Sequence, residues 1–297
     1  MRYIITLLLT SVPALAEVPR VVTDIPPVHA LVAQVMGDLG QPELLLARGA
    51  DEHDFQLRPS QAGAVADADL VVWIGPELTP WLASALETRP EGAAALGLLD
   101  ATGTVLRDYG ANEAHGGDHE GHDHAGVDPH AWLDPGNGQV WLGLIAAELA
   151  RLDPENAGAY AANAAQAAGR LKELDAGIAA RLAAVKGQPL VTFHDAYGYF
   201  AAHYGLDVAG SLALGDAAAP GAARLQDLRA VLEAGEIPCI FPETQHDPAL
   251  IERMVEGTRV RIGGALDPVG SSLEPGPGAY AALLEGMAGT IASCLGQ

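Results

Sequence analysis

The feature that most constrains the fold is a long helical run in the middle of the chain. The helical pattern begins near residue 138, breaks once at Asp153-Pro154, and then continues without proline through the 31 residues 155–185. At 1.5 Å per residue, those residues would extend about 46 Å. They lack the clean a/d heptads with charged e and g positions of an isolated coiled coil. We therefore expect this helix to pack along the protein and to join two domains.

On both sides of this run, short strand patterns alternate with helical patterns. Before it, strands are expected at 20–25, 42–47 and 70–75, and helices at 29–40, 60–68 (capped by Ser60) and 81–87. After it, strands are expected at 189–194, 238–243 and 259–268, and helices at 195–205, 224–236, 247–258 and 278–295. This order predicts parallel sheets with helices on both faces. The expected fold class is α/β, with two lobes and one connecting helix.

The first 16 residues have the pattern of a secretory signal peptide. Arg2 precedes a short apolar run that closes with Ala14-Leu15-Ala16. That run is too short to span a membrane, and no other stretch reaches the roughly 18 consecutive apolar residues that a span needs. We therefore expect residues 1–16 to be removed and the mature protein to work in a bacterial periplasm, with no insertion into the membrane.

The net charge argues against some classes of partner, and the cysteines indicate a disulfide. A formal net charge of −22 argues against nucleic acid and anionic membranes, because both need clustered lysine and arginine. A carboxylate-rich surface attracts cations, although it also fits a merely solvated acidic surface. The two cysteines, Cys239 and Cys294, predict a disulfide in an oxidising compartment. Their spacing does not suggest a thiolate metal site.

Four residues suited to binding a metal stand at predicted strand ends or in loops: His53, His130, His194 and Asp267. In a doubly wound sheet such positions meet in one crevice at the carboxyl ends of the strands. Three imidazoles and one carboxylate form a tetrahedral zinc set, whereas manganese prefers oxygen ligands. The wide spacing has no specificity by itself, since a single histidine is more often a surface or hydrogen-bonded residue than a ligand.

The residues around these positions resemble a known family. The segment GADEHDFQLRPSQAGAVADADLVVWIGPELTPWL is followed in order by DPHAWLDP, FHDAYGYF and ALDPVG, and by the late cysteine pair. Together they resemble the periplasmic zinc-binding proteins of ABC uptake transporters, the ZnuA-like group of the cluster A-I metal solute-binding family. The resemblance implies two Rossmann-like lobes, a long rigid helix, and one Zn²⁺ in the cleft, delivered to an inner-membrane ABC permease.

The same resemblance implies a ligand set. His53, His130 and His194 correspond to the zinc ligands of the family, and manganese-binding relatives carry a carboxylate where His194 stands. The fourth ligand stays open. The interpretation leans to Asp267, with Glu52 or a water as the alternatives.

Other residues near these motifs have separate interpretations. His29 and His246 are interpreted as surface residues, with an approach to the cleft as the alternative, and the family often has an apolar or aromatic residue at the position of His246. His203 is interpreted as a helix residue near a C-terminus, where a cation is favoured. Asp195 and Asp134 are candidates to orient a ligand imidazole through its other ring nitrogen.

A histidine-rich loop precedes His130. The stretch HGGDHEGHDH carries four histidines without periodicity, namely His115, His119, His122 and His124. Its glycines and acids predict an exposed, mobile loop, which should bind zinc more weakly than a preformed cleft because ordering it costs entropy. We interpret it as an auxiliary loop that gathers or senses zinc for the main site. A low-complexity insertion without function is the alternative.

These features predict a domain order and a function. The expected parts are the signal peptide, an N-terminal lobe (17–153) that includes the histidine-rich loop (112–127), a linker helix (154–186) and a C-terminal lobe (187–297). The predicted function is zinc capture and delivery by a monomer, without catalysis. A zinc hydrolase or lyase is the rival class, but H-E-x-x-H and G-x-S-x-G motifs are absent. A lipid-anchored adhesin is a third, but no cysteine follows the leader.

Overall fold

The computed structural model describes residues 18–53, 55–109, 126–213 and 221–297. The predicted signal peptide and the four histidines of the histidine-rich loop lie outside these residues. None of the helices in these ranges combines the length and the apolar character that a membrane span requires.

Strands and helices alternate on both sides of the long helix. The strands are β1 (Val21–Thr23), β2 (Glu43–Leu44), β3 (Leu70–Trp73), β4 (Ala94–Gly97), β5 (Pro189–His194), β6 (Asp207–Ala213), β7 (Cys239–Ile240) and β8 (Arg261–Ile262). The helices are α1 (Pro26–Met36), α2 (Pro59–Asp67), α3 (Pro80–Leu86), α4 (Pro135–Leu152), α5 (Ala157–Leu182), α6 (Gly198–Tyr204), α7 (Ala222–Ala234), α8 (Ala249–Val255) and α9 (Ala279–Leu295).

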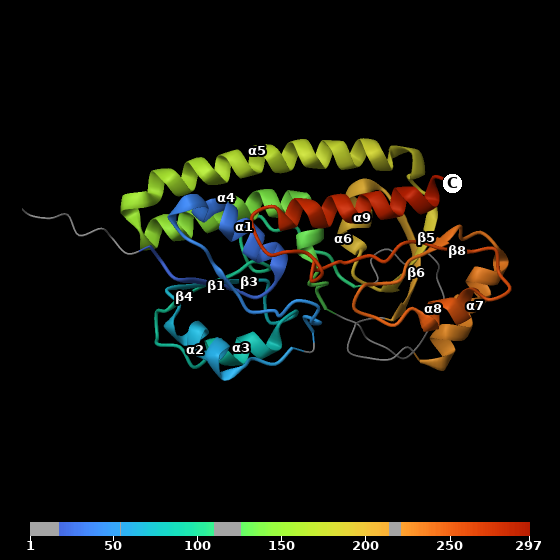
Figure 1. Ribbon diagram of the computed structural model, residues 1–297, viewed down its shortest axis with the longest axis horizontal. Coiled ribbons are helices and arrows are strands. Elements are labelled where there is room, and N and C mark those ends of the chain that lie inside the picture. The colour runs from blue at the N-terminus through green and yellow to red at the C-terminus, as the bar shows by residue number, and fades with distance from the viewer. Residues whose placement is uncertain (1–17, 54, 110–125, 214–220) are drawn as a thin grey trace, which may run out of the picture.

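Two parallel sheets form the framework of the molecule (Figure 1). The first sheet has the strand order β2-β1-β3-β4, and the second has the order β6-β5-β7-β8. Neighbouring strands in both sheets pair in parallel. The predicted α/β class with two parallel sheets is confirmed.

Burial on both faces of the first sheet explains why β3 is apolar along its whole length. Successive side chains of a strand point to opposite faces. Leu70 and Val72 lie in the core that also holds α1, whereas Val71 and Trp73 lie in a second core beneath α2 and α3. The sheet is therefore covered by helices on both faces, as expected for parallel strands.

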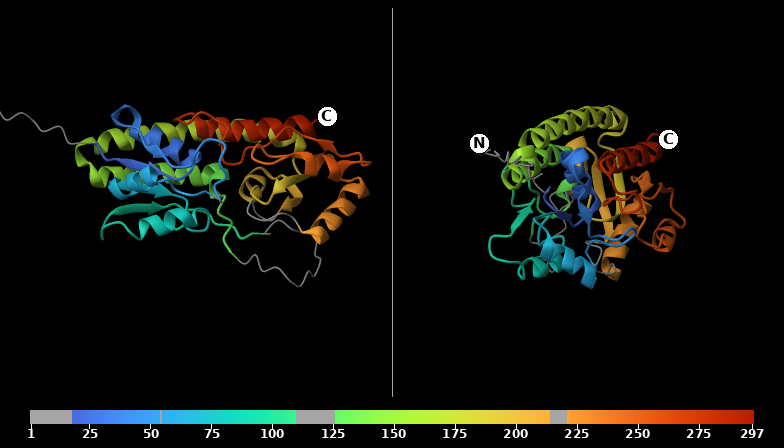
Figure 2. Two further views of the ribbon diagram at one scale, coloured as in Figure 1. Left: turned by 60° about the horizontal axis from the view of Figure 1, so that its bottom comes forward. Right: turned by 60° about the vertical axis from the view of Figure 1, so that its left-hand side comes forward.

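A layer of long helices connects the two sheets. The helix α5 is 26 residues long and is flanked by the 3₁₀ turns Pro154–Asn156 and Ala183–Val185. It packs against α1, α4 and α9, and it extends past both sheets, with α9 beside only the part of it near the second sheet (Figure 1 and Figure 2). The largest apolar core contains side chains from both halves of the chain. The predicted long connecting helix is confirmed, while the domain boundaries at 153 and 186 stay a prediction.

Two details of local structure bear on the sequence predictions. Cys239 and Cys294 form a disulfide that fastens α9 to β7 of the second sheet, as predicted. The helix α2 begins at Pro59 with Arg58 at its N-cap, so the prediction of Ser60 as the cap is wrong. Proline suits the first helical position because its φ is preset and its missing N–H has no helical partner there.

Candidate metal site

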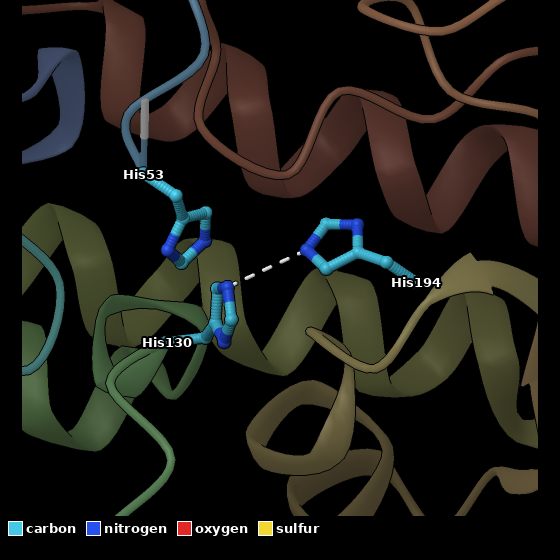
Figure 3. Close-up of side chains that lie close together, drawn as sticks. All are labelled: His53, His130 and His194. Atoms are coloured by element: carbon cyan, nitrogen blue, oxygen red, sulfur yellow. Dashed lines mark hydrogen bonds between the residues drawn. The ribbon is translucent and has the colours of Figure 1, made fainter. Parts of the chain in front are cut away.

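The structure brings three of the predicted ligands together (Figure 3). His53, His130 and His194 each offer one ring nitrogen, and these three atoms lie within 4.8 Å of one another. The Nε2 atoms of His130 and His194 are 3.4 Å apart. Two ligands of a tetrahedral zinc ion, each about 2.1 Å from the metal, lie about 3.4 Å apart. The spacing of these two nitrogens therefore suits a single zinc ion.

Each histidine comes from a different part of the fold. His53 lies in the loop after β2, and its backbone N–H donates to Oδ1 of Asp51 at 2.8 Å. His130 directly precedes the 3₁₀ turn Ala131–Leu133. His194 is the last residue of β5 in the second sheet. The three imidazoles therefore meet only when both halves of the chain are folded against each other.

A buried carboxylate holds the ring of His130. Its Nδ1 lies 2.7 Å from Oδ1 of Asp128, and the same oxygen accepts the backbone N–H of His130 at 3.0 Å. A proton on Nδ1 leaves the lone pair on Nε2, which is the atom that faces His194. Burial lowers the pKa of His130 against the opposing effect of Asp128, so the ring is neutral at pH 7 and available to a metal.

A second buried carboxylate holds the ring of His194. Nδ1 of His194 lies 2.6 Å from Oε2 of Glu243, and Oε1 accepts the Tyr197 hydroxyl at 2.9 Å. Strand register explains the pairing: Val191 of β5 pairs with Ile240 of β7, and His194 and Glu243 each lie three residues further along. The ring of His194 is therefore fixed from the neighbouring strand.

The acids that hold these two rings differ from those suggested by the sequence. Asp134 caps α4, accepting the N–H of Gly136 at 2.7 Å, and its Oδ1 lies 2.9 Å from Nδ1 of His203. The role suggested for Asp195 stays a prediction. The missed signals were an aspartate two residues before His130 and a glutamate that ends the PCIFPE strand pattern.

Asp267, the favoured fourth ligand, does not belong to the group formed by the three histidines within the described chain. Its carboxylate accepts the N–H groups of Ser271 and Ser272 at 3.1 and 2.9 Å, and the amide of Gln245 at 3.2 Å. The backbone oxygen of Ser271 in turn accepts the N–H of Gly49 at 3.1 Å. Asp267 thus shapes a loop that contacts the segment leading to His53, and its role as a ligand stays a prediction.

Glu52, the alternative fourth ligand, is buried next to His53 in sequence. Its backbone oxygen accepts the indole N–H of Trp81 at 2.9 Å. Like Asp267, it is not a member of the three-histidine group found among the described residues. The identity of a fourth ligand therefore stays open between these two side chains and a water.

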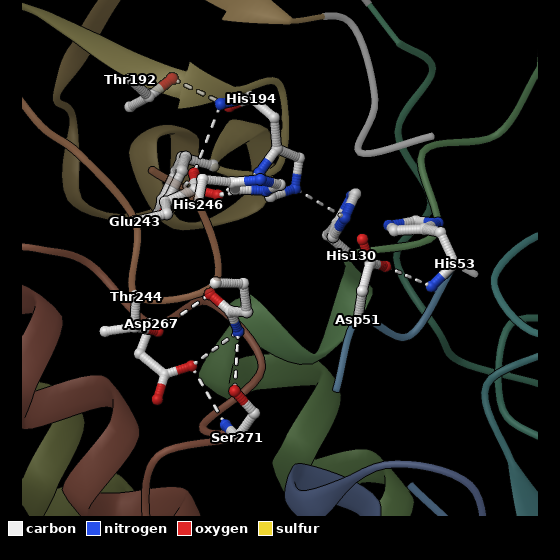
Figure 4. A network of polar contacts seen from close by, with 12 residues as sticks. Asp51, His53, His130, Thr192, His194, Glu243, Thr244, His246, Asp267 and Ser271 are labelled. Carbon is white, nitrogen blue, oxygen red and sulfur yellow. Dashed lines mark hydrogen bonds and ion pairs between the residues drawn. The ribbon is translucent and has the colours of Figure 1, made fainter. Parts of the chain in front are cut away.

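The remaining described histidines fall into three environments. His29 is buried and its Nε2 lies 3.2 Å from the backbone oxygen of Pro42, so its interpretation as a surface residue is wrong. His203 is in the last turn of α6, as predicted, and Asp134 and Asp175 raise its pKa to about 9. His246 lies beside His194 and Glu243 (Figure 4), so the alternative of an approach to the cleft holds for it.

Comparison with known proteins identifies relatives over almost the whole chain. The family model described as the periplasmic component A of the zinc-uptake complex, ZnuA, matches residues 21–294. The high-affinity zinc uptake system protein ZnuA of Paracoccus denitrificans is 52% identical over 314 residues, covering 96% of this chain and 94% of that protein.

Solved structures share the fold at low sequence identity. The periplasmic zinc-binding protein TroA of Treponema pallidum superposes with a TM-score of 0.78 at 22% identity, covering 93% of this chain and 99% of that one. The laminin-binding protein Lmb of Streptococcus agalactiae, described as having adhesin and metal-transporting activity, also gives a TM-score of 0.78 at 22% identity, with 93% and 99% coverage. At this identity the likeness shows the fold alone.

Proposed function

Because this chain belongs to the family of periplasmic zinc-uptake components, we propose that it captures one Zn²⁺ between its two lobes and presents it to an inner-membrane ABC permease for import. The ligands in this proposal are His53, His130 and His194. The high-affinity zinc uptake proteins among its relatives support zinc as the cargo.

One observation carries the proposal. Three imidazoles from separate segments converge, and the Nδ1 atoms of two of them face the buried carboxylates of Asp128 and Glu243. A carboxylate on one ring nitrogen fixes the tautomer and the ring orientation, and it makes the other nitrogen a better metal ligand. The arrangement is typical of a zinc site that is formed before the ion arrives.

The donor set favours zinc over the harder divalent cations. Imidazole nitrogen suits zinc, copper, nickel and iron, whereas carboxylate and carbonyl oxygens suit manganese, magnesium and calcium. The three members of the described group are all imidazoles. We therefore expect manganese to compete poorly with zinc.

The proposal extends to where and how the protein works. Zinc capture requires no chemical step, and we assign the chain no catalytic activity. Both lobes of one chain supply the three histidines, which supports a monomer as the working unit. The family description and the predicted leader support a periplasmic location.

The ligand assignment is tested by a chelator-competition zinc titration of single variants at pH 7.4. Loss of partners that only orient zinc ligands typically costs 10- to 100-fold in affinity, so loss of a ligand should cost roughly 100-fold or more. We expect that loss in His53→Ala, His130→Ala and His194→Ala. His203→Ala, which removes an imidazole from α6 outside the site, should keep its affinity. Near wild-type affinity in any of the first three would remove that residue from the site.

A further inference from the structure

A second group of metal-binding side chains lies next to the three-histidine site. His194, Glu243 and His246 each offer a ligand atom, and these atoms lie within 4.8 Å of one another. In Figure 4, Glu243 and His246 lie on the side of His194 away from His130. The two groups therefore share one imidazole and use opposite sides of it.

The side chain of His246 is held in place by a neighbouring aromatic ring. Its ring stacks on Phe193, with ring centroids 4.1 Å apart and an interplanar angle of 15°. This stacking leaves Nε2 of His246 3.7 Å from Oε2 of Glu243. Two ligands of one tetrahedral zinc ion lie about 3.4 Å apart, so this pair needs little movement to bind the same ion.

Exposure differs across the second group. The side chain of His246 is 20% exposed, whereas those of His194 and Glu243 are each 1% exposed. An ion held by all three residues would therefore lie nearer to solvent than one held by His53, His130 and His194.

We propose that His194, Glu243 and His246 form a second zinc position, which an ion occupies in passing between solvent and the three-histidine site. This inference rests on the proposed function, because it concerns the path of the same cargo.

The shared imidazole makes occupancy of the two positions alternate. A neutral imidazole has one lone pair, so His194 can offer Nε2 to the main site or Nδ1 to the second position, but not both. When zinc moves to Nδ1, the ring loses to solvent the Nδ1 proton that it had donated in the hydrogen bond to Glu243, and Nε2, which the zinc has left, takes up a proton from solvent. The number of protons on the ring is unchanged, and Glu243 changes from hydrogen-bond acceptor to zinc ligand.

The same geometry makes the second position the weaker one. Nδ1 of His194 and Oε2 of Glu243 lie 2.6 Å apart, which suits a hydrogen bond. Zinc ligands need a separation of about 3.4 Å, so the carboxylate must move back by roughly 0.8 Å before both can bind one ion. The Nε2 atoms of His130 and His194 in the main site need no such change, because they are already 3.4 Å apart. Zinc should therefore rest in the main site and visit the second.

The first test removes the main site and keeps the second. In the mature chain without residues 115–124, the change His53→Ala with His130→Ala removes two main-site ligands. Zinc titration of this folded background should show one weak site. Adding His246→Phe keeps a ring against Phe193 but removes the ligand nitrogen, and should weaken that residual affinity by roughly tenfold or more.

The matched control is Glu252→Gln in the same background. Glu252 is an exposed carboxylate of α8, outside the group of three, so its loss should leave the residual affinity unchanged. Residual binding that falls equally in both variants would be general attraction to an acidic surface and would overturn the inference. An absence of residual binding in the folded background would overturn it too.

The second test leaves every main-site ligand in place. Zinc-loaded chain without residues 115–124 is mixed with excess chromophoric chelator, and the rate of zinc release is followed. If the ion leaves through the second position, His246→Phe should slow release about threefold or more while the zinc stoichiometry stays at one. Tight zinc binding with an unchanged release rate would contradict the second position and leave the proposed function standing. Loss of tight binding in the parent would overturn the proposed function itself.

Discussion

The Nδ1 atoms of His130 and His194 lie 2.7 and 2.6 Å from buried carboxylate oxygens, and this determines which nitrogen each ring offers to a metal. A proton held between Nδ1 and a carboxylate commits the lone pair to Nε2. In both residues Nε2 points to the same place. The chemistry of the site thus depends on Asp128 and Glu243 as well as on the histidines.

The substitution Asp128→Asn tests the role of this carboxylate with little change in the shape of the side chain. Asparagine keeps an oxygen that can accept the N–H groups of His130 but loses the negative charge. We expect zinc affinity at pH 7 to fall about 10- to 100-fold, measured by chelator competition. Asp227→Asn, an exposed change in α7, is the matched control and should have no effect. Affinity of the Asp128 variant within twofold of wild type would show that the carboxylate is not needed.

Among the elements, the sequence predicted those whose side chains have a clear pattern. PLVTFH is apolar and β-rich, and β5 spans those six residues as predicted. The strands β4 and β6 were missed, because AALG and DVAGSLA contain small residues and glycine and few β-branched ones. Their strand pairing is a consequence of the sheet, with β3 and β5 as the templates.

For the site too, the sequence could predict residues with a clear local pattern but not pairings that depend on the folded sheet. Three histidines could be proposed because they stand at strand ends or beside recognisable motifs. Glu243 could not be assigned to His194, because that pairing depends on β5 and β7 being neighbours in register, which is a property of the folded sheet. Asp267 could not be distinguished as a loop-shaping residue, because its hydrogen bonds with Gln245, Ser271 and Ser272 form only when the loop is folded.

His203 joins three helices through its two ring nitrogens. Nδ1 lies 2.9 Å from Oδ1 of Asp134 at the start of α4, and Nε2 lies 2.8 Å from Oδ1 of Asp175 in α5. The hydrogen bond with Asp134 is the largest cause that raises the pKa of His203 from 6.5 to about 9, with Asp175 adding to it and burial opposing it. In the protonated form, His203 therefore fastens α6 to both helices.

This contact predicts a loss of stability at alkaline pH. The pKa of His203 in the folded state is above its unfolded value of 6.5, so its stabilisation is complete below about pH 6.5 and is lost as pH rises through 9. We expect the free energy of unfolding of the metal-free protein to fall by about 2 kcal/mol more between pH 6 and pH 10 in wild type than in His203→Gln, measured by urea denaturation. An equal fall in both proteins would show that protonated His203 does not stabilise the fold.

At the scale of the whole molecule, a shared core limits how far the two sheets can separate. The helices α1, α4, α5 and α9 all contribute side chains to the largest apolar cluster, which also reaches β3 and β5. The disulfide ties α9 to β7, and α9 also packs against α1 beside the first sheet. We expect small adjustments around a bound ion rather than a wide hinge opening.

The most direct test of the central claim is a chelator-competition zinc titration of the mature protein lacking residues 115–124. His53, His130 and His194 all lie outside the deleted segment. We therefore expect one tight zinc per chain, with an affinity close to that of the intact protein. Disappearance of tight binding would contradict the claim and would make the loop histidines, rather than His53, His130 and His194, the zinc site.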